Sequence, residues 1–238
     1  MEIQNVSLME PASSLDIYHS KTTVPLPGIV IIPGGSYKQI VERDTERVAI
    51  TLAAQAFQTF VVRYPVLEQR SYSGAKRAIA QAFDYLTAHA AALDLDPARL
   101  GILGFSAGGQ LAAAYSNQLG TKARFAGLGY PVIQPTIDQR MGVTTENVAA
   151  LVTAQTPPTF VWGSVRDDVT PYQDHIAVYT AALARNRVPF ELHEFSTGGH
   201  GLGLANYYTG IVNNQRTDEH MARWLPLFLD WLKQLESE

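Results

Sequence analysis

Short apolar runs and amphipathic segments with helical spacing alternate along most of this chain. Residues 28–32 are wholly apolar and end at Pro33, Gly34 and Gly35, which is typical of a strand buried on both faces. The same reading predicts further strands at residues 59–63, 99–104, 125–130, 159–163 and 190–195. It predicts helices at residues 45–57, 73–93, 107–118, 173–186 and 218–235.

The first twenty residues have a different pattern. Apolar and polar positions alternate around a turn at residues 11–14, which predicts an antiparallel pair of strands at the edge of a sheet. Together with the strand and helix alternation that follows, this predicts an α/β fold. We expect a three-layer α/β/α sandwich around a mostly parallel, twisted sheet with an antiparallel strand pair at its N-terminal end.

The length of 238 residues suits one domain spanning residues 1–238. One segment interrupts its regular alternation: residues 132–157 contain no convincing strand, although residues 146–153 have the pattern of a short helix. A long insertion at the carboxyl edge of a sheet often forms a lid or a wall of a site. We therefore expect a small cap here.

Composition and charge exclude several classes of protein. The net charge of -4 gives no basic field for binding nucleic acid, and the absence of cysteine excludes disulfides and thiolate catalysis. The N-terminus lacks a signal-peptide pattern, and no apolar run is long enough to cross a membrane, so a cytoplasmic location is expected. No metal-ligand spacing and no dinucleotide-binding glycine motif is present, and no cofactor is predicted.

The strongest chemical signal is the G-x-S-x-G sequence at residues 104–108, placed between a predicted strand and a predicted helix. A serine in that context lies on a tight turn that exposes its hydroxyl above the sheet edge. The start of the helix and the Ala107 amide would favour negative charge beside it. We predict that Ser106 is a nucleophile.

A serine nucleophile needs a base, and the base needs an acid that orients it, in the chain order Ser, Asp or Glu, His. Asp167 and Asp168 follow the strand at residues 159–163, and the spacing to Pro171 favours Asp167 as the acid. His200 lies in a glycine-rich loop after the last predicted strand, which can bring its imidazole back over the sheet edge. We predict that His200 is the base.

The loop after the first central strand is expected to supply amides that stabilise an oxyanion. Gly34 and Gly35 are the predicted donors on this side and Ala107 on the other, although the sequence leaves open which amide of residues 34–36 points inward. Ser36 and Tyr37 are candidate substrate contacts at the mouth of the site.

Together these motifs resemble the α/β-hydrolase superfamily, within the branch of acetyl xylan esterase-like and hormone-sensitive-lipase-like carboxylesterases. The resemblance runs from about Gly28 to the C-terminus. Pro33 and Ser36 differ from the His-Gly-Gly-Gly loop of the hormone-sensitive-lipase branch, so the chain is more similar to the acetyl xylan esterase-like group. The resemblance implies hydrolysis of short acyl esters, acetyl above all and including those of carbohydrates, through an acyl-enzyme intermediate.

Two other functions remain open at this point. The same three residue types serve amide cleavage in arylformamidases, and some proteins with this fold are non-catalytic binding modules. The expected partner is a small-molecule ester, with neither nucleic acid nor membrane, and exposed edge strands would allow a homodimer.

Overall fold

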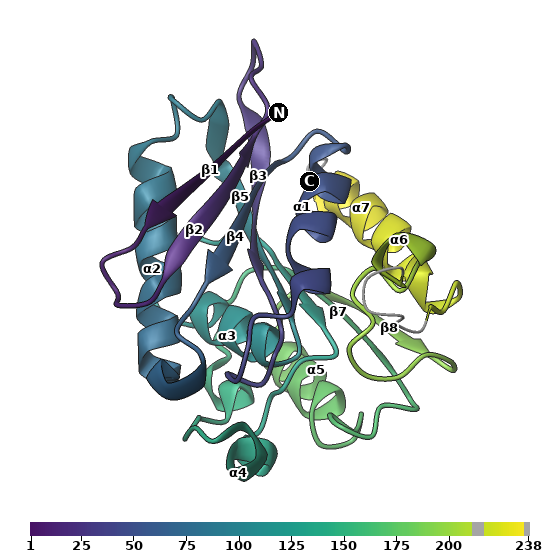
Figure 1. Ribbon diagram of the computed structural model, residues 1–238. Coiled ribbons are helices and arrows are strands. Elements are labelled where there is room, and N and C mark those ends of the chain that lie inside the picture. Colours follow the sequence, from purple (N-terminus) through teal and green to yellow (C-terminus); the bar gives the residue numbers. More distant parts are fainter. Residues whose placement is uncertain (211–216, 236–238) are drawn as a thin grey trace.

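The computed structural model describes residues 1–210 and 217–235, and in them a twisted sheet crosses the whole molecule (Figure 1). Its strand order is β1-β2-β4-β3-β5-β6-β7-β8. The pairs β1–β2 and β2–β4 are antiparallel, and all later pairs are parallel. The strands are β1 (Glu2–Ser7), β2 (Ser14–His19), β3 (Leu26–Ile32), β4 (Gln58–Arg63), β5 (Leu95–Phe105), β6 (Ala126–Gly129), β7 (Thr159–Ser164) and β8 (Phe190–Phe195).

Helices cover both faces of the sheet, which confirms the predicted three-layer α/β architecture. The helices are α1 (Glu46–Ala53), α2 (Tyr72–Ala88), α3 (Ala107–Ser116), α4 (Asp138–Met141), α5 (Ile176–Arg185), α6 (Tyr207–Gly210) and α7 (Trp224–Leu235). One hydrophobic core lies under α2, α3 and α5, and the other under α1 and α7. In β3, Val30 and Ile32 face the first core while Ile29 and Ile31 face the second, as the two-residue period of a strand requires.

The predicted elements exist, but several boundaries differ. The α1 and α2 helices end four and five residues before the predicted ends, in turns at 54–56 and 89–94. The β5 strand begins at Leu95, four residues before the predicted start, because Leu95 pairs with Leu26 ahead of the main register. At the C-terminus, residues 218–220 precede a 3₁₀ turn (Met221–Arg223) that leads into α7.

The insertion at residues 132–157 consists of short turns attached to the domain. The helix expected at 146–153 is only a 3₁₀ turn (Val148–Leu151), and α4 is an additional short helix. Arg70 Nε donates to the Gly142 carbonyl at 3.0 Å, Tyr72 Oη to Glu146 at 2.9 Å, and Gln110 Nε2 to Thr145 Oγ1 at 3.0 Å. These bonds attach the insertion to Arg70, to α2 and to α3.

None of the helices described is long and apolar enough to cross a membrane.

Candidate active site

Ser106 lies on the turn between β5 and α3 in a conformation that side chains rarely adopt. Its φ is 55° and its ψ is -121°, and the residue is only 8% exposed. A Cβ on Gly108 would collide with the carbonyl oxygens of Ile32 and Pro33, so glycine there lets α3 begin directly against the end of β3. The turn therefore holds Ser106 at the carboxyl end of β5, directly before the start of α3.

The loops after β7 and β8 bring the predicted acid and base to this serine. Ser106 Oγ lies 2.7 Å from His200 Nε2, and His200 Nδ1 lies 2.8 Å from Asp167 Oδ2. Because the carboxylate oxygen accepts, Nδ1 carries a proton, and in the neutral imidazole Nε2 is then free to accept from the serine hydroxyl. Asp168 is exposed, and Asp167 is the member of the pair that contacts the histidine.

Asp167 is held by further donors from its own loop. Its Oδ1 accepts the amides of Val169 and Thr170 at 2.9 and 2.8 Å, and its Oδ2 accepts the Thr170 hydroxyl at 2.8 Å. Burial alone would raise the pKa of Asp167, but the hydrogen bonds from His200 and Thr170 and the charge of His200 lower it overall. The carboxylate therefore stays ionised and fixed in place.

Tyr130 supports His200 from the end of β6. The two rings meet edge to face with centroids 5.0 Å apart. The Tyr130 hydroxyl accepts the Gly203 amide at 2.9 Å, while Trp224 Nε1 donates to the Gly203 carbonyl at 3.0 Å. These contacts fasten the glycine-rich loop at Gly203 and limit where the imidazole can lie.

The structure corrects the prediction for Gly34. Its amide donates to Asp44 Oδ2 at 3.2 Å, and the Asp44 side chain is 1% exposed. This amide already has an acceptor, so it is not available to a substrate oxygen. Within the described residues the amides of Gly35 and Ala107 have no acceptor, and these two remain candidate donors.

Tyr37 is also corrected. The residue is fully buried, packs its ring against Tyr64 and Tyr72, and donates its hydroxyl to Gln110 Oε1 at 3.0 Å. The turn at residues 35–37 has positive φ angles, which direct Tyr37 into the core beneath the loop. A substrate at Ser106 does not reach it. Ser36, by contrast, lines the hollow beside Ser106.

That hollow has a volume of about 300 Å³ and opens beside Ser106 and His200. Its walls come from the loop after β3, the glycine-rich loop after β8, and α4 of the insertion, which contributes Arg140. A larger hollow of about 600 Å³ is lined by Phe57, Phe125 and Leu232 among others, and it includes none of the predicted site residues. The smaller hollow, which Ser106 and His200 line, is therefore the candidate substrate site.

Comparisons with known proteins show what this chain is similar to. The sequence model of the BD-FAE family matches residues 15–127. The chain is 25% identical to endo-1,4-beta-xylanase B of Butyrivibrio fibrisolvens over 82% of its own length, but spans only 36% of that protein.

Solved structures match along nearly the whole chain. The carboxylesterase Cest-2923 of Lactobacillus plantarum is 25% identical with a TM-score of 0.90, covering 99% of this chain and 98% of that one. MGS-M1, an alpha/beta hydrolase from a deep-sea metagenome, is 26% identical with a TM-score of 0.91, covering 100% and 99%. This chain belongs to the α/β-hydrolase superfamily.

A third solved structure is closer in its chemistry to the predicted function. The acetyl ester-xyloside bifunctional hydrolase of Caldicellulosiruptor lactoaceticus is 25% identical with a TM-score of 0.79, covering 94% of this chain and 88% of that one. The names of these relatives support the prediction of an ester-hydrolysing enzyme.

Sequence reasoning missed four residues around the candidate site: Asp44, Arg43, Tyr130 and Thr170. Thr170 has a local signal, since it stands three residues after Asp167 and directly before Pro171, where a hydroxyl can bond back to the acid. Asp44 has a weaker signal, a carboxylate at the start of a helical pattern that reads equally well as a helix cap. No sequence pattern indicates that the Asp44 carboxylate accepts the Gly34 amide, ten residues before it.

Of the other histidines in the chain, His175 is the most informative. It is fully buried, and its Nδ1 accepts the amides of Ile133 and Gln134 at 3.0 and 3.3 Å. It therefore attaches the start of the insertion to α5 and does not contact Ser106. Over residues 1–210 and 217–235, no three His, Asp or Glu side chains gather in an arrangement that could hold a metal ion.

Proposed function

We propose that this protein is a serine carboxylesterase that hydrolyses short-chain acyl esters, acetyl esters of carbohydrates above all. The observation that carries the proposal is the continuous hydrogen-bonded path from Ser106 Oγ through His200 to Asp167, built on a strained turn at the sheet edge. Such a path activates a hydroxyl that is otherwise a weak nucleophile.

In the proposed reaction, Ser106 Oγ attacks the ester carbonyl while its proton passes to His200 Nε2. The resulting oxyanion accepts hydrogen bonds from the amides of Gly35 and Ala107, next to the positive end of the α3 dipole. His200 then gives the proton to the leaving alcohol, and the acyl group stays on Ser106. Water, deprotonated by His200, attacks this acyl-enzyme and releases the carboxylic acid and the serine.

The size of the site supports a short acyl group. The hollow of about 300 Å³ is at the lower end of the range for small-molecule sites, and charged and polar side chains form much of its lining. The insertion at residues 132–157 is attached to the domain by hydrogen bonds, so we propose that it forms a wall of one domain spanning residues 1–238. Residues 211–216 and 236–238 of that range lie outside the described part.

The names of relatives also support an esterase that acts on acylated carbohydrates. They include carboxylesterases and an acetyl ester-xyloside hydrolase, and the xylanase relative adds a link to xylan. A cytoplasmic location and a homodimer stay predictions.

A series of p-nitrophenyl esters from acetyl to octanoyl tests the proposal, with Ser106→Ala as the inactive control. We expect the highest kcat/KM with acetyl or butyryl and no activity above background in the variant. A wild-type protein silent on every ester, but active on an N-formyl anilide, would contradict the esterase and favour an arylformamidase.

A further inference from the structure

The hollow beside Ser106 is positively charged in an acidic protein. Its lining includes three cationic side chains, Lys38, Arg43 and Arg140, and one carboxylate, Asp44, whereas the whole chain has a net charge of -4. A cleft lined by charges of one sign concentrates ligands of the opposite sign. The charge of this hollow therefore bears on the substrate.

The acidic residues nearest in sequence are engaged with other groups, and one of them, Asp44, pairs with Arg43. Glu42 is bound by Arg63, with Nη1 at 2.9 Å, and Asp138 accepts the amide and hydroxyl of Thr145, both at 2.6 Å. Asp44 lies beneath the surface against Gly34 and Arg43, and burial raises the pKa of its carboxyl group. No carboxylate in the described part of the chain forms an ion pair with Lys38 or Arg140.

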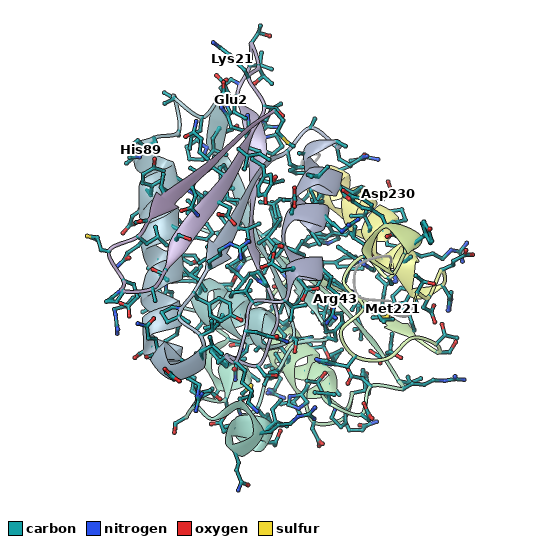
Figure 2. All side chains as sticks on the ribbon, viewed as in Figure 1. Glu2, Lys21, Arg43, His89, Met221 and Asp230 are labelled. Carbon is teal, nitrogen blue, oxygen red and sulfur yellow. The ribbon has the colours of Figure 1, made fainter. Side chains whose placement is uncertain are left out.

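These cations come from two separate elements that converge on one site. Lys38 and Arg43 lie in the loop after β3, and Figure 2 shows Arg43 close to the lower end of α1. Arg140 comes from α4, which is held through Gly142 and Thr145. Because α4 is attached to the domain, the backbone that carries Arg140 is positioned before binding, and the remaining cost is the ordering of the exposed side chains.

We propose that the substrate carries a carboxylate on its alcohol part, which Lys38, Arg43 and Arg140 bind while Ser106 attacks the acyl carbonyl. This inference rests on the proposed function: a short acyl group leaves the alcohol as the part large enough to bear the charge. The substrate class is then an acetylated acidic sugar, with an ester on a hydroxyl of a uronic acid residue.

A matched pair of substrates tests this class: mono-O-acetyl galacturonic acid and mono-O-acetyl galactose, which differ at the C6 carboxylate. Acetate release at low ionic strength gives kcat/KM for each. We expect the acidic sugar to be preferred about tenfold or more, mostly through KM, since charge-assisted hydrogen bonds are stronger than neutral ones. Added salt is expected to reduce the preference, because exposed charges are screened.

The double variant Lys38→Gln/Arg140→Gln is expected to bring the ratio of the two kcat/KM values toward one. Lys21→Gln is the charge-matched control, since Lys21 is exposed at the top of the view in Figure 2, well away from Arg43, and it should leave the ratio unchanged. Circular dichroism checks that each variant is folded.

The outcomes separate the two proposals. If the protein cleaves p-nitrophenyl acetate through Ser106 but shows no preference for the acidic sugar, or if the double variant keeps that preference in full, the anionic substrate is excluded and the esterase stands. If it cleaves no ester at all, the proposed function fails and this inference fails with it.

Discussion

The two sides of Ser106 are built in different ways. On the side of the base, Asp167 accepts four donors, and both oxygens of its carboxylate are satisfied by His200 and the residues that follow it in its own loop. On the oxyanion side, the loop after β3 has positive φ at residues 35–37 and is tied down by Asp44, which lies ten residues from the Gly34 amide it accepts. The acid is held largely by a local motif in its own loop, whereas the oxyanion loop depends on a contact between its two ends.

This difference predicts where substitutions act. On the base side, a substitution of Asp167 removes the group that keeps the proton on Nδ1 of His200, so the loss of catalytic activity should be large. On the oxyanion side, a substitution of Asp44 should loosen the loop after β3 but leaves every reacting group in place. The loss of activity should therefore be smaller and should appear in kcat, the rate of the chemical step.

The largest effect is expected from Asp167→Asn, which leaves the geometry but presents an amide to His200. We expect kcat to fall about 10³ to 10⁴-fold, because the imidazole then favours the wrong tautomer. Steady-state kinetics on p-nitrophenyl acetate measures it. Asp168→Asn is the control and should stay within about twofold of wild type, since a surface residue outside the contact contributes little; equal losses in the two variants would exclude Asp167 as the acid.

On the oxyanion side, Asp44→Ala leaves the Gly34 amide without its acceptor and frees the loop. We expect kcat to fall about 10 to 100-fold with little change in KM, less than the loss of a donor itself. Asp44→Asn retains an acceptor oxygen and should recover most of the rate. Glu42→Ala, a neighbouring carboxylate bound to Arg63, is the control. A change in KM alone would show that Asp44 does not position the oxyanion loop.

Thr170→Val sharpens the comparison within the base side. It removes the hydroxyl that donates to Asp167 Oδ2 at 2.8 Å but keeps the shape of the side chain. The loss of one hydrogen bond to a charged group predicts a fall in kcat/KM of about tenfold. Because that bond lowers the pKa of Asp167, the variant should also lose activity at a higher pH on the acid side of its profile. Thr170→Ser should behave as wild type, and a wild-type rate in Thr170→Val would contradict the role.

The smallest effect concerns stability, at the junction between the acid loop and the insertion. Burial lowers the pKa of His175 below its ordinary value of 6.5, although Asp174 and Asp167 act in the opposite direction. Below pH 6.5 His175 becomes protonated in the unfolded chain but stays neutral in the folded protein. The free energy of unfolding therefore falls as the pH falls toward the pKa of His175 in the folded protein. Urea unfolding between pH 7.5 and 5 measures this.

His175→Asn keeps an acceptor for the two amides but cannot titrate, so its stability should vary less with pH over the same interval. An identical pH dependence in variant and wild type would assign the effect to other groups.

The sequence predicted the features that follow from local patterns. Strand and helix order, the antiparallel start, and the approach of Ser106, Asp167 and His200 all follow from periodicity and from the position of each residue after a strand of a parallel sheet. What it missed depends on how loops fold over one another. Tyr37 was expected at the site mouth, but positive φ at residues 35–37 directs it into the core. Asp44 takes the Gly34 amide through a return of the loop that no spacing rule reveals.

The most direct test of the central claim is covalent labelling of the wild-type protein with a fluorophosphonate, followed by peptide mass spectrometry. The reagent phosphonylates a serine only where a base activates it. The account predicts a single phosphonyl group on the peptide that contains Ser106, loss of ester hydrolysis in proportion to labelling, and no label in His200→Ala. Label on another serine, or full ester hydrolysis in a protein whose Ser106 is completely labelled, would contradict it.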